Sequence, residues 1–267
     1  MDYYEKKGNI ILKQPDFDLD ETLDCGQAFR WEKINENTYK GFFLRKPLEI
    51  SQSGDVFTLY NTSEEEFLNV WADYFDLKTD YSELKRRFSE DESLARAVNY
   101  AGGIRLLKQD LSETLISFII SQNNNIPRIK AIISRLCDKY GGFPDIEQLD
   151  GVTADDLAFL RAGFRAKYLE DCVNKVNGGA VDLNAVRNAE TAEARKMLMT
   201  VKGVGPKVAD CVLLFGAHKT DAFPVDVWIK RVMSEFYPDG LPECVKGYEG
   251  IAQQYLFHYV RTGVKNV

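Results

Sequence analysis

Hydrophobic and polar positions change their period along this chain. Up to about residue 60, short runs of β-branched and aromatic residues alternate with turn signals such as those at residues 35–37 and 53–55. Runs of this kind are typical of strands in an antiparallel sheet. We predict such strands over residues 9–12, 38–44, 48–51 and 56–60.

From about residue 80, apolar residues recur at helical spacing. The segment 112–121 is apolar on nearly every side, which predicts a buried central helix. A capping box at residues 63–66 and a proline at Pro127 mark two helix starts. Further helices are predicted over residues 81–87, 92–100, 128–140, 154–161, 167–177, 188–200, 206–215, 227–236 and 248–260.

These patterns together predict an α+β protein. We expect an N-terminal antiparallel β domain over residues 1–80. A helical bundle that contains a helix–hairpin–helix motif should follow over residues 81–267. No internal repeat interrupts either part.

Composition limits the function classes. The chain has 267 residues, of which 45% are hydrophobic, so it can bury a sizeable core. No apolar run approaches the ~20 residues of a membrane span, and the first seven residues do not resemble a signal peptide. The five cysteines form no CxxC pair and no iron–sulfur spacing, and only two histidines are present. We therefore expect a soluble intracellular protein without a metal or cofactor.

Net charge is −7, which by itself argues against a nucleic-acid partner. The first 100 residues carry 21 acidic and 13 basic side chains, whereas residues 101–267 carry 20 and 21. The acidity therefore lies in the first part. The second part is nearly neutral, and its composition permits a local basic face.

The segment from Val201 to Cys211 predicts a hairpin between two helices. Gly203 and Gly205 flank Val204 and permit a tight turn, and Pro206 suits the first position of the next helix. Such a turn directs backbone N–H groups and a helix N-terminus outward. The hairpin can therefore hold a phosphate without needing net positive charge.

Lys207 falls in the first turn of that second helix. The positive end of the helix dipole disfavours an ammonium group, and a neutral lysine is a usable nucleophile. From the hairpin alone, phosphate binding is favoured over catalysis. Asp226 changes this balance, because it stands 19 residues later at an expected helix start. It could be only an N-cap, but one helix and a loop have the right length to return its carboxylate to the amine.

The run 203–211 followed by Pro224-Val-Asp226 resembles the helix–hairpin–helix/Gly-Pro-Asp superfamily of DNA glycosylases, and more closely its 8-oxoguanine DNA glycosylases. Further segments match that family in order, namely residues 25–31, 104–110, 121–128, 163–168 and 252–257. Each motif alone is weakly specific, but together they cover nearly the whole chain. The chain is shorter than the eukaryotic enzyme, which suggests a bacterial member in the cytoplasm, associated with the nucleoid through DNA.

The resemblance implies a bifunctional reaction. Lys207 would attack C1′ of a flipped nucleotide and expel the oxidised base, and β-elimination would then nick the strand. Asp226 would be the catalytic carboxylate. For base binding, the resemblance implies a carbonyl acceptor from Gly26, a Watson–Crick contact from Gln253, and stacking by Phe257 and Cys211.

The resemblance also implies a DNA-binding set. Asn123 would fill the space of the flipped base, Arg128 and Arg165 would bind the orphaned cytosine, and Phe164 would wedge beside it. Gly203 and Gly205 of the hairpin would contact the backbone, as would Trp228, which replaces a histidine of the eukaryotic enzyme. The expected partner is double-stranded DNA that contains oxidised guanine, bound by a monomer. No cofactor, metal or membrane is expected.

Other interpretations remain open. Without the other motifs, the Asn residues of 123–125 would be helix caps and the arginines solvated surface; Gln27, Phe29 and Trp31 are expected to be core residues. One alternative is a monofunctional glycosylase for alkylated bases, which typically has the aspartate without the hairpin lysine. Another is a non-catalytic helix–hairpin–helix DNA-binding protein. A redox-cluster endonuclease relative is disfavoured by the cysteine spacing.

Overall fold

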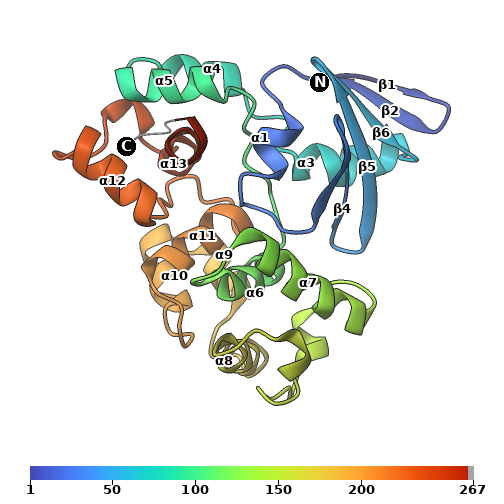
Figure 1. Cartoon of the computed structure of the whole chain (residues 1–267), viewed down its shortest axis with the longest axis vertical. Coiled ribbons are helices and arrows are strands. Elements are labelled where there is room, and N and C mark those ends of the chain that lie inside the picture. The colour runs from blue at the N-terminus through green and yellow to red at the C-terminus, as the bar shows by residue number, and fades with distance from the viewer. Residues whose placement is uncertain (264–267) are drawn as a thin grey trace. The chain divides into compact units, whose positions relative to one another are not determined.

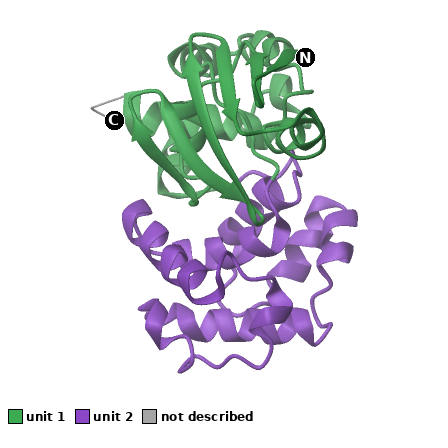
Figure 2. Cartoon of the chain, turned by 90° about the vertical axis from the view of Figure 1, so that its right-hand side faces the viewer, with its two compact units in different colours: residues 1–108, 225–267 green, residues 109–224 purple. Residues whose placement is uncertain are grey.

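The computed structural model describes residues 1–263, which form two compact units. Unit 1 comprises residues 1–108 together with the chain from residue 225 onward, and unit 2 comprises residues 109–224 (Figure 2). The boundaries of these two units therefore differ from the predicted domain boundary at residue 80. The reason is that the C-terminal helices pack on the part of unit 1 that follows the sheet: the Tyr255 hydroxyl, for example, donates to the Ile104 carbonyl at 3.1 Å.

A six-stranded antiparallel sheet forms one part of unit 1 (Figure 1). Its order is β1-β2-β6-β5-β4-β3. The sequence predicted the four inner strands, but it missed both edge strands. Most residues of these two strands are exposed, so their sequences lack the alternation of apolar and polar residues that predicts a strand. The strands are β1 (Asp2–Lys6), β2 (Asn9–Lys13), β3 (Trp31–Asn35), β4 (Thr38–Phe43), β5 (Lys46–Ser53) and β6 (Val56–Tyr60).

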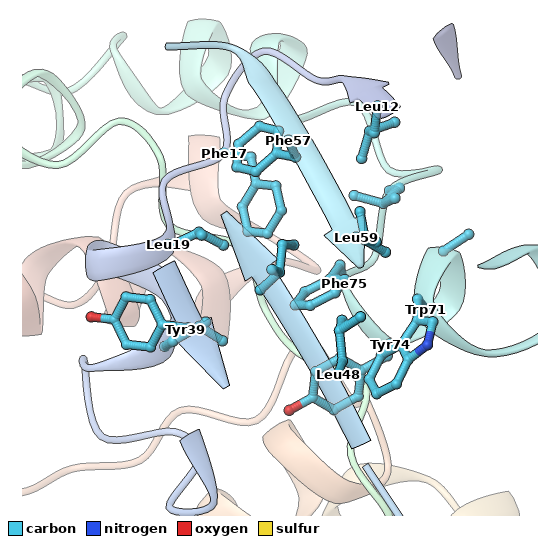
Figure 3. Close-up of a cluster of buried hydrophobic side chains, with 14 of the residues drawn as sticks. Leu12, Phe17, Leu19, Tyr39, Leu48, Phe57, Leu59, Trp71, Tyr74 and Phe75 are labelled. Atoms are coloured by element: carbon cyan, nitrogen blue, oxygen red, sulfur yellow. The ribbon is translucent and has the colours of Figure 1, made fainter. Parts of the chain in front are cut away.

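Aromatic side chains fill the space between the sheet and the helical segment of residues 64–74 (Figure 3). The Trp31 indole donates to the Tyr74 hydroxyl at 2.7 Å, and Phe17 stacks on Phe57 with ring centroids 4.6 Å apart. Gly41 of β4 lies against Trp31, since a Cβ there would be 2.4 Å from the indole. Trp31 is therefore a core residue, as predicted.

The helices of unit 1 occur before and after unit 2 along the chain. The helix predicted from residue 63 contains a π-helical turn, Phe67–Trp71. The set is α1 (Leu19–Leu23), α2 (Glu64–Glu66), α3 (Ala72–Tyr74), α4 (Tyr81–Phe88), α5 (Glu92–Tyr100), α12 (Val227–Phe236) and α13 (Glu249–His258), which continues as a π-helical turn over Tyr259–Gly263.

Unit 2 is helical throughout its regular elements. As predicted, α6 (Leu111–Ser121) is central: eight of its residues are buried, and its Phe118 stacks on Phe215 of α11 (Pro206–Gly216) with ring centroids 5.4 Å apart. The helices are α6 (Leu111–Ser121), α7 (Ile126–Tyr140), α8 (Arg165–Asn177), α9 (Leu183–Asn188), α10 (Thr191–Leu198) and α11 (Pro206–Gly216).

Two predicted helices of unit 2 were wrong in extent. The segment 154–161 contains only a 3₁₀ turn, Ala158–Leu160, which follows other turns and ends at Arg161, a left-handed residue with a φ of 55°. The segment 188–200 begins later, at Thr191, because Ala189 is extended and closes the preceding helix α9. The overall α+β class is nevertheless confirmed. Within residues 1–263, no helix combines the length and apolarity that a bilayer crossing requires.

Candidate functional site

The hairpin between α10 and α11 forms as the sequence predicts. Buried Val201 and Val204 anchor it, and the Val204 amide donates to the Val201 carbonyl at 3.0 Å. Gly203 has a φ of +80°, the left-handed region that favours glycine. Gly205 is the N-cap of α11 and has no side chain with which to cap it. The first-turn amides are therefore left for an external acceptor such as a phosphate.

Lys207 and Cys211 lie four residues apart on α11, on one face of the helix. Lys207 is half-buried, with its amine 5.5 Å from the centroid of the Phe118 ring. Cys211 is buried. An amine held beside an apolar ring in the first turn of a helix is well placed for nucleophilic chemistry.

An ion pair joins the two helices of the hairpin. Arg195 of α10 donates from Nε to Oδ1 of Asp210 on α11 at 2.6 Å. Burial raises the pKa of the Asp210 carboxyl, and the Arg195 guanidinium opposes this rise. The pair fixes α11, and with it Lys207, against α10. Sequence reasoning missed it, although a lone aspartate inside the apolar run 206–215 was a usable signal.

The polar junction between α6 and α7 is a tight exposed turn. Asn123 is exposed and has a φ of +47°. Asn125 is the N-cap of α7, since its side chain accepts from the Arg128 amide at 3.0 Å. The helix-cap interpretation is thus correct for Asn125. Arg128 follows on the exposed first turn of the helix.

Arg165 is buried at the start of α8 rather than solvated, with 3% of its surface exposed. Its guanidinium donates to the carbonyls of Gln122, Asn123 at 2.9 Å and Ala162 at 3.1 Å. Burial, and then the charge of Arg128, lower the pKa of Arg165. The side chain thus ties α8 to the junction. Its predicted contact with an orphaned cytosine stays a prediction.

Phe164 precedes α8 and is 50% exposed. Its ring lies 4.5 Å from the Arg165 guanidinium carbon and meets the Tyr168 ring edge-on at 5.5 Å. A large exposed aromatic residue beside the Asn123 junction is suited to stack against an unpaired base. Its wedge role is a prediction that this position favours.

In unit 1, the loop around Gly26 contacts the C-terminal helix α13. The Cys25 thiol lies 3.8 Å from Oε1 of Gln254, across 229 residues of sequence. The Gln254 amide in turn donates to Oε1 of Gln253 at 2.6 Å. Arg261 donates to the Cys25 carbonyl at 3.4 Å and lies 5.7 Å from the Phe257 ring. Gly26, Gln253 and Phe257 are therefore carried by two segments that touch.

Gly26 has a φ of +95°, and the next residue, Gln27, is buried as predicted. The Gln27 amide donates to the carbonyls of Thr22 at 2.9 Å and Arg105 at 2.8 Å and accepts from the Leu107 amide at 3.0 Å. Gln27 thus holds the loop that carries Gly26.

Asp226 is the N-cap of α12. Its Oδ1 accepts from the amides of Trp228 at 3.0 Å and Ile229 at 2.9 Å. Oδ2 makes no hydrogen bond to another described residue, and the side chain is half-buried. The cap interpretation is correct, and a cap with one free oxygen is compatible with a second role. Trp228 is half-buried, with Arg231 5.4 Å from its ring.

The predicted residues thus form local groups. Unit 2 carries two groups. The hairpin group is Gly203, Gly205, Lys207 and Cys211, and the junction group is Asn123, Arg128, Phe164 and Arg165. Unit 1 carries the α13 group, namely Gly26, Gln253 and Phe257, and the α12 pair, namely Asp226 and Trp228. Among the described residues, no cluster of three or more His, Cys, Asp or Glu side chains could hold a metal ion.

Comparison with known proteins covers both units. The family described as "8-oxoguanine DNA glycosylase, N-terminal domain" matches residues 9–115. The family described as "HhH-GPD superfamily base excision DNA repair protein" matches residues 116–240. An N-glycosylase/DNA lyase of Arabidopsis thaliana is 32% identical, over 85% of this chain and 68% of the relative. A probable N-glycosylase/DNA lyase of Methanothermobacter thermautotrophicus is 30% identical, over 84% and 83% of the two chains.

A solved structure agrees with these relatives. The 8-oxoguanine glycosylase/lyase of Clostridium acetobutylicum, solved with duplex DNA that has cytosine opposite 8-oxoguanine, superposes with a TM-score of 0.90. It is 39% identical and covers 98% of each chain. Fold, hairpin and sequence similarity lead to one assignment: this chain belongs to the N-glycosylase/DNA lyase family of HhH-GPD base excision DNA repair proteins.

Proposed function

We propose that this protein is a bifunctional DNA glycosylase that removes 8-oxoguanine from duplex DNA and then nicks the abasic site. The observation that carries the proposal is the position of Lys207, a half-buried amine in the first turn of α11 directly after an uncapped hairpin. The hairpin grips a phosphate of the lesion strand through its amides, which places the sugar of that strand at the amine.

The reaction has two chemical stages. The Lys207 amine attacks C1′ of the damaged nucleotide, the N-glycosidic bond breaks, and the oxidised base leaves with the bonding electrons. Loss of a proton and opening of the sugar give a Schiff base. Removal of a C2′ proton then expels the 3′ phosphate by β-elimination. Asp226 is proposed to orient the amine and to stabilise the positive charge that develops on the sugar.

Base selection is proposed to depend on the α13 group. The N7–H of 8-oxoguanine is a donor that guanine lacks. A carbonyl acceptor at Gly26 therefore forms a hydrogen bond with 8-oxoguanine and repels the N7 lone pair of guanine. Gln253 reads the Watson–Crick edge, and Phe257 and Cys211 stack on the two faces of the flipped base. These contacts must offset the few kcal/mol that base flipping costs.

The junction group is proposed to fill the gap that the flipped base leaves in the duplex and to bind the base that has lost its partner. Asn123 fills the gap in the stack, Phe164 wedges beside it, and Arg128 and Arg165 contact the orphaned cytosine. Gly203, Gly205 and Trp228 bind the phosphate backbone. We also propose that the protein acts as a monomer, in the cytoplasm of a bacterium.

The test uses duplexes with 8-oxoguanine opposite each of the four bases and borohydride trapping of the Schiff base. The wild-type protein should release the base, nick the strand and form a trapped adduct. Lys207→Gln should form no adduct and should lose at least about 10³ in base-release rate. Lys202→Gln is the matched control, because it removes an exposed lysine of the same hairpin.

Three outcomes would contradict the proposal. An adduct with Lys207→Gln would assign the nucleophile elsewhere. Base release without any adduct from the wild-type protein would indicate a monofunctional enzyme. Salt-sensitive DNA binding without base release from any lesion duplex would indicate a non-catalytic binding protein.

A further inference from the structure

One face of α8 holds the hairpin. Tyr168, Asp171 and Lys175 follow one another at i, i+3 and i+7, so they share a side of the helix. All three contact the segment 200–203, which forms the hairpin turn. We call these three side chains the α8 clamp.

The contacts of the clamp are specific. A Cβ on Gly203 would lie 2.3 Å from the Tyr168 ring, so the hairpin backbone rests directly on that ring. The Asp171 carboxylate accepts from the Lys202 amide at 2.6 Å. The Lys175 amine donates to the Thr200 carbonyl at 2.5 Å and pairs with Asp171 at 3.0 Å.

The electrostatics of Asp171 agree with this geometry. Burial by itself raises the pKa of the carboxyl, but the Lys202 amide and the Lys175 ammonium outweigh it and leave the pKa below its usual range. Asp171 is therefore charged at neutral pH and accepts strongly from the hairpin backbone.

The same helix is fastened to the junction at its other end. Arg165 donates to the carbonyls of Gln122 and Asn123, and Phe164 meets the clamp residue Tyr168 edge-on. Ten residues separate Arg165 from Lys175, which is about 15 Å along a helix. A single rigid element is thus bonded to the junction group and to the hairpin group.

We propose that the α8 clamp is a set of positioning residues that fixes the spacing between the opposite-strand junction and the hairpin that carries Lys207. The inference rests on the proposed function, in which the junction contacts the orphaned base and the hairpin grips the lesion strand. With the spacing fixed, a wrong opposite base displaces the hairpin and slows attack by Lys207. Selectivity for the opposite base is therefore expressed in the chemical step.

The test compares single-turnover base-release rates for 8-oxoguanine opposite cytosine and opposite adenine. Tyr168→Leu removes the flat ring beneath Gly203, and Asp171→Ala removes the acceptor of the Lys202 amide. Each should reduce the cytosine-over-adenine ratio by about fivefold or more. Tyr168→Phe keeps the ring and should behave like wild type, as should Asn174→Ala, an exposed position on the same helix.

Two results would overturn this proposal, and a third would overturn the proposed function instead. Equal slowing on both duplexes, with an unchanged ratio, would show a purely structural role and overturn the proposal. A wild-type ratio near one would overturn it as well. Lys175→Gln, at a half-buried site, tests another contact of the α8 clamp, the one to the Thr200 carbonyl, if Tyr168→Leu fails to fold. A wild-type protein that releases no base from any duplex would instead refute the proposed function.

Discussion

Arg105 is 0% exposed, although an arginine is almost never fully buried. Its guanidinium donates to the carbonyls of Phe75, Asp16, Asp76 and Thr79, and it lies 4.1 Å from the Tyr81 ring centroid. The sequence shows only an arginine in an apolar run at residues 104–107. The structure gives this residue a physical role, which is to satisfy backbone acceptors that would otherwise be buried without partners.

Arg105→Lys should destabilise the protein by roughly 2–4 kcal/mol, because an ammonium group cannot reach the same set of carbonyls. Urea unfolding measures this difference. Arg96→Lys is the control, since Arg96 forms an exposed pair with Glu92 and should change stability by less than about 0.5 kcal/mol. A variant of Arg105 as stable as wild type would show that these hydrogen bonds contribute little.

At the scale of an element, α13 and its π-helical extension combine apolar packing with titratable groups. His258 is half-buried at the end of α13, with the Tyr100 ring 6.0 Å away. Burial, and then the charge of Arg261, lower the pKa of His258 from its usual 6.5, while Asp18 opposes the shift. The folded state therefore favours the neutral imidazole.

This shift has a definite sign. Below pH 6.5 the His258 side chain takes up a proton more readily in the unfolded chain than in the folded protein. Its contribution to the free energy of unfolding is therefore fully present above pH 6.5 and is lost as the pH falls toward the folded pKa. The fall should not exceed about 1.4 kcal/mol per pH unit. Unfolding free energies at pH 7.5 and 5.5 should differ more for wild type than for His258→Gln. Equal differences for the two proteins would remove His258 as the cause.

Elements also differ in how far their sequences predict them. Helices with a proline in the first turn, such as α7 and α11, lie within two residues of the prediction. The helix predicted over 154–161 is reduced to a 3₁₀ turn, although the Thr153 and Asp156 side chains accept from each other's backbone amides as in a capping box. A start signal in the sequence therefore does not fix how far a helix continues, because that depends on tertiary packing.

At the scale of the whole molecule, a net charge of −7 sets this protein apart from strongly basic DNA-binding proteins. Backbone amides of the hairpin form part of the proposed grip, so few cations need to contact phosphates. We expect the logarithm of the binding constant to fall with the logarithm of salt concentration with a slope of only about −2 to −4.

Fluorescence anisotropy with a duplex that carries an abasic-site analogue, at salt concentrations from about 50 to 200 mM, measures this slope. Arg128→Gln should leave the slope unchanged, because its guanidinium is proposed to contact the orphaned cytosine and not a phosphate, and a slope less steep by about one would contradict that role. A wild-type slope steeper than about −6 would contradict a grip built mainly from amides.

The sequence by itself determined what depends on near neighbours: the inner strands, the capped helices, the hairpin with Gly203 and Pro206, and the place of Lys207 in a first helical turn. These follow from backbone preferences that act over a few residues. Tertiary structure decided the burial of Arg105 and Arg165, the contact of Cys25 with Gln254, and the seating of the hairpin on Tyr168. Such contacts join residues that are far apart in sequence, so the packing of whole elements determines them.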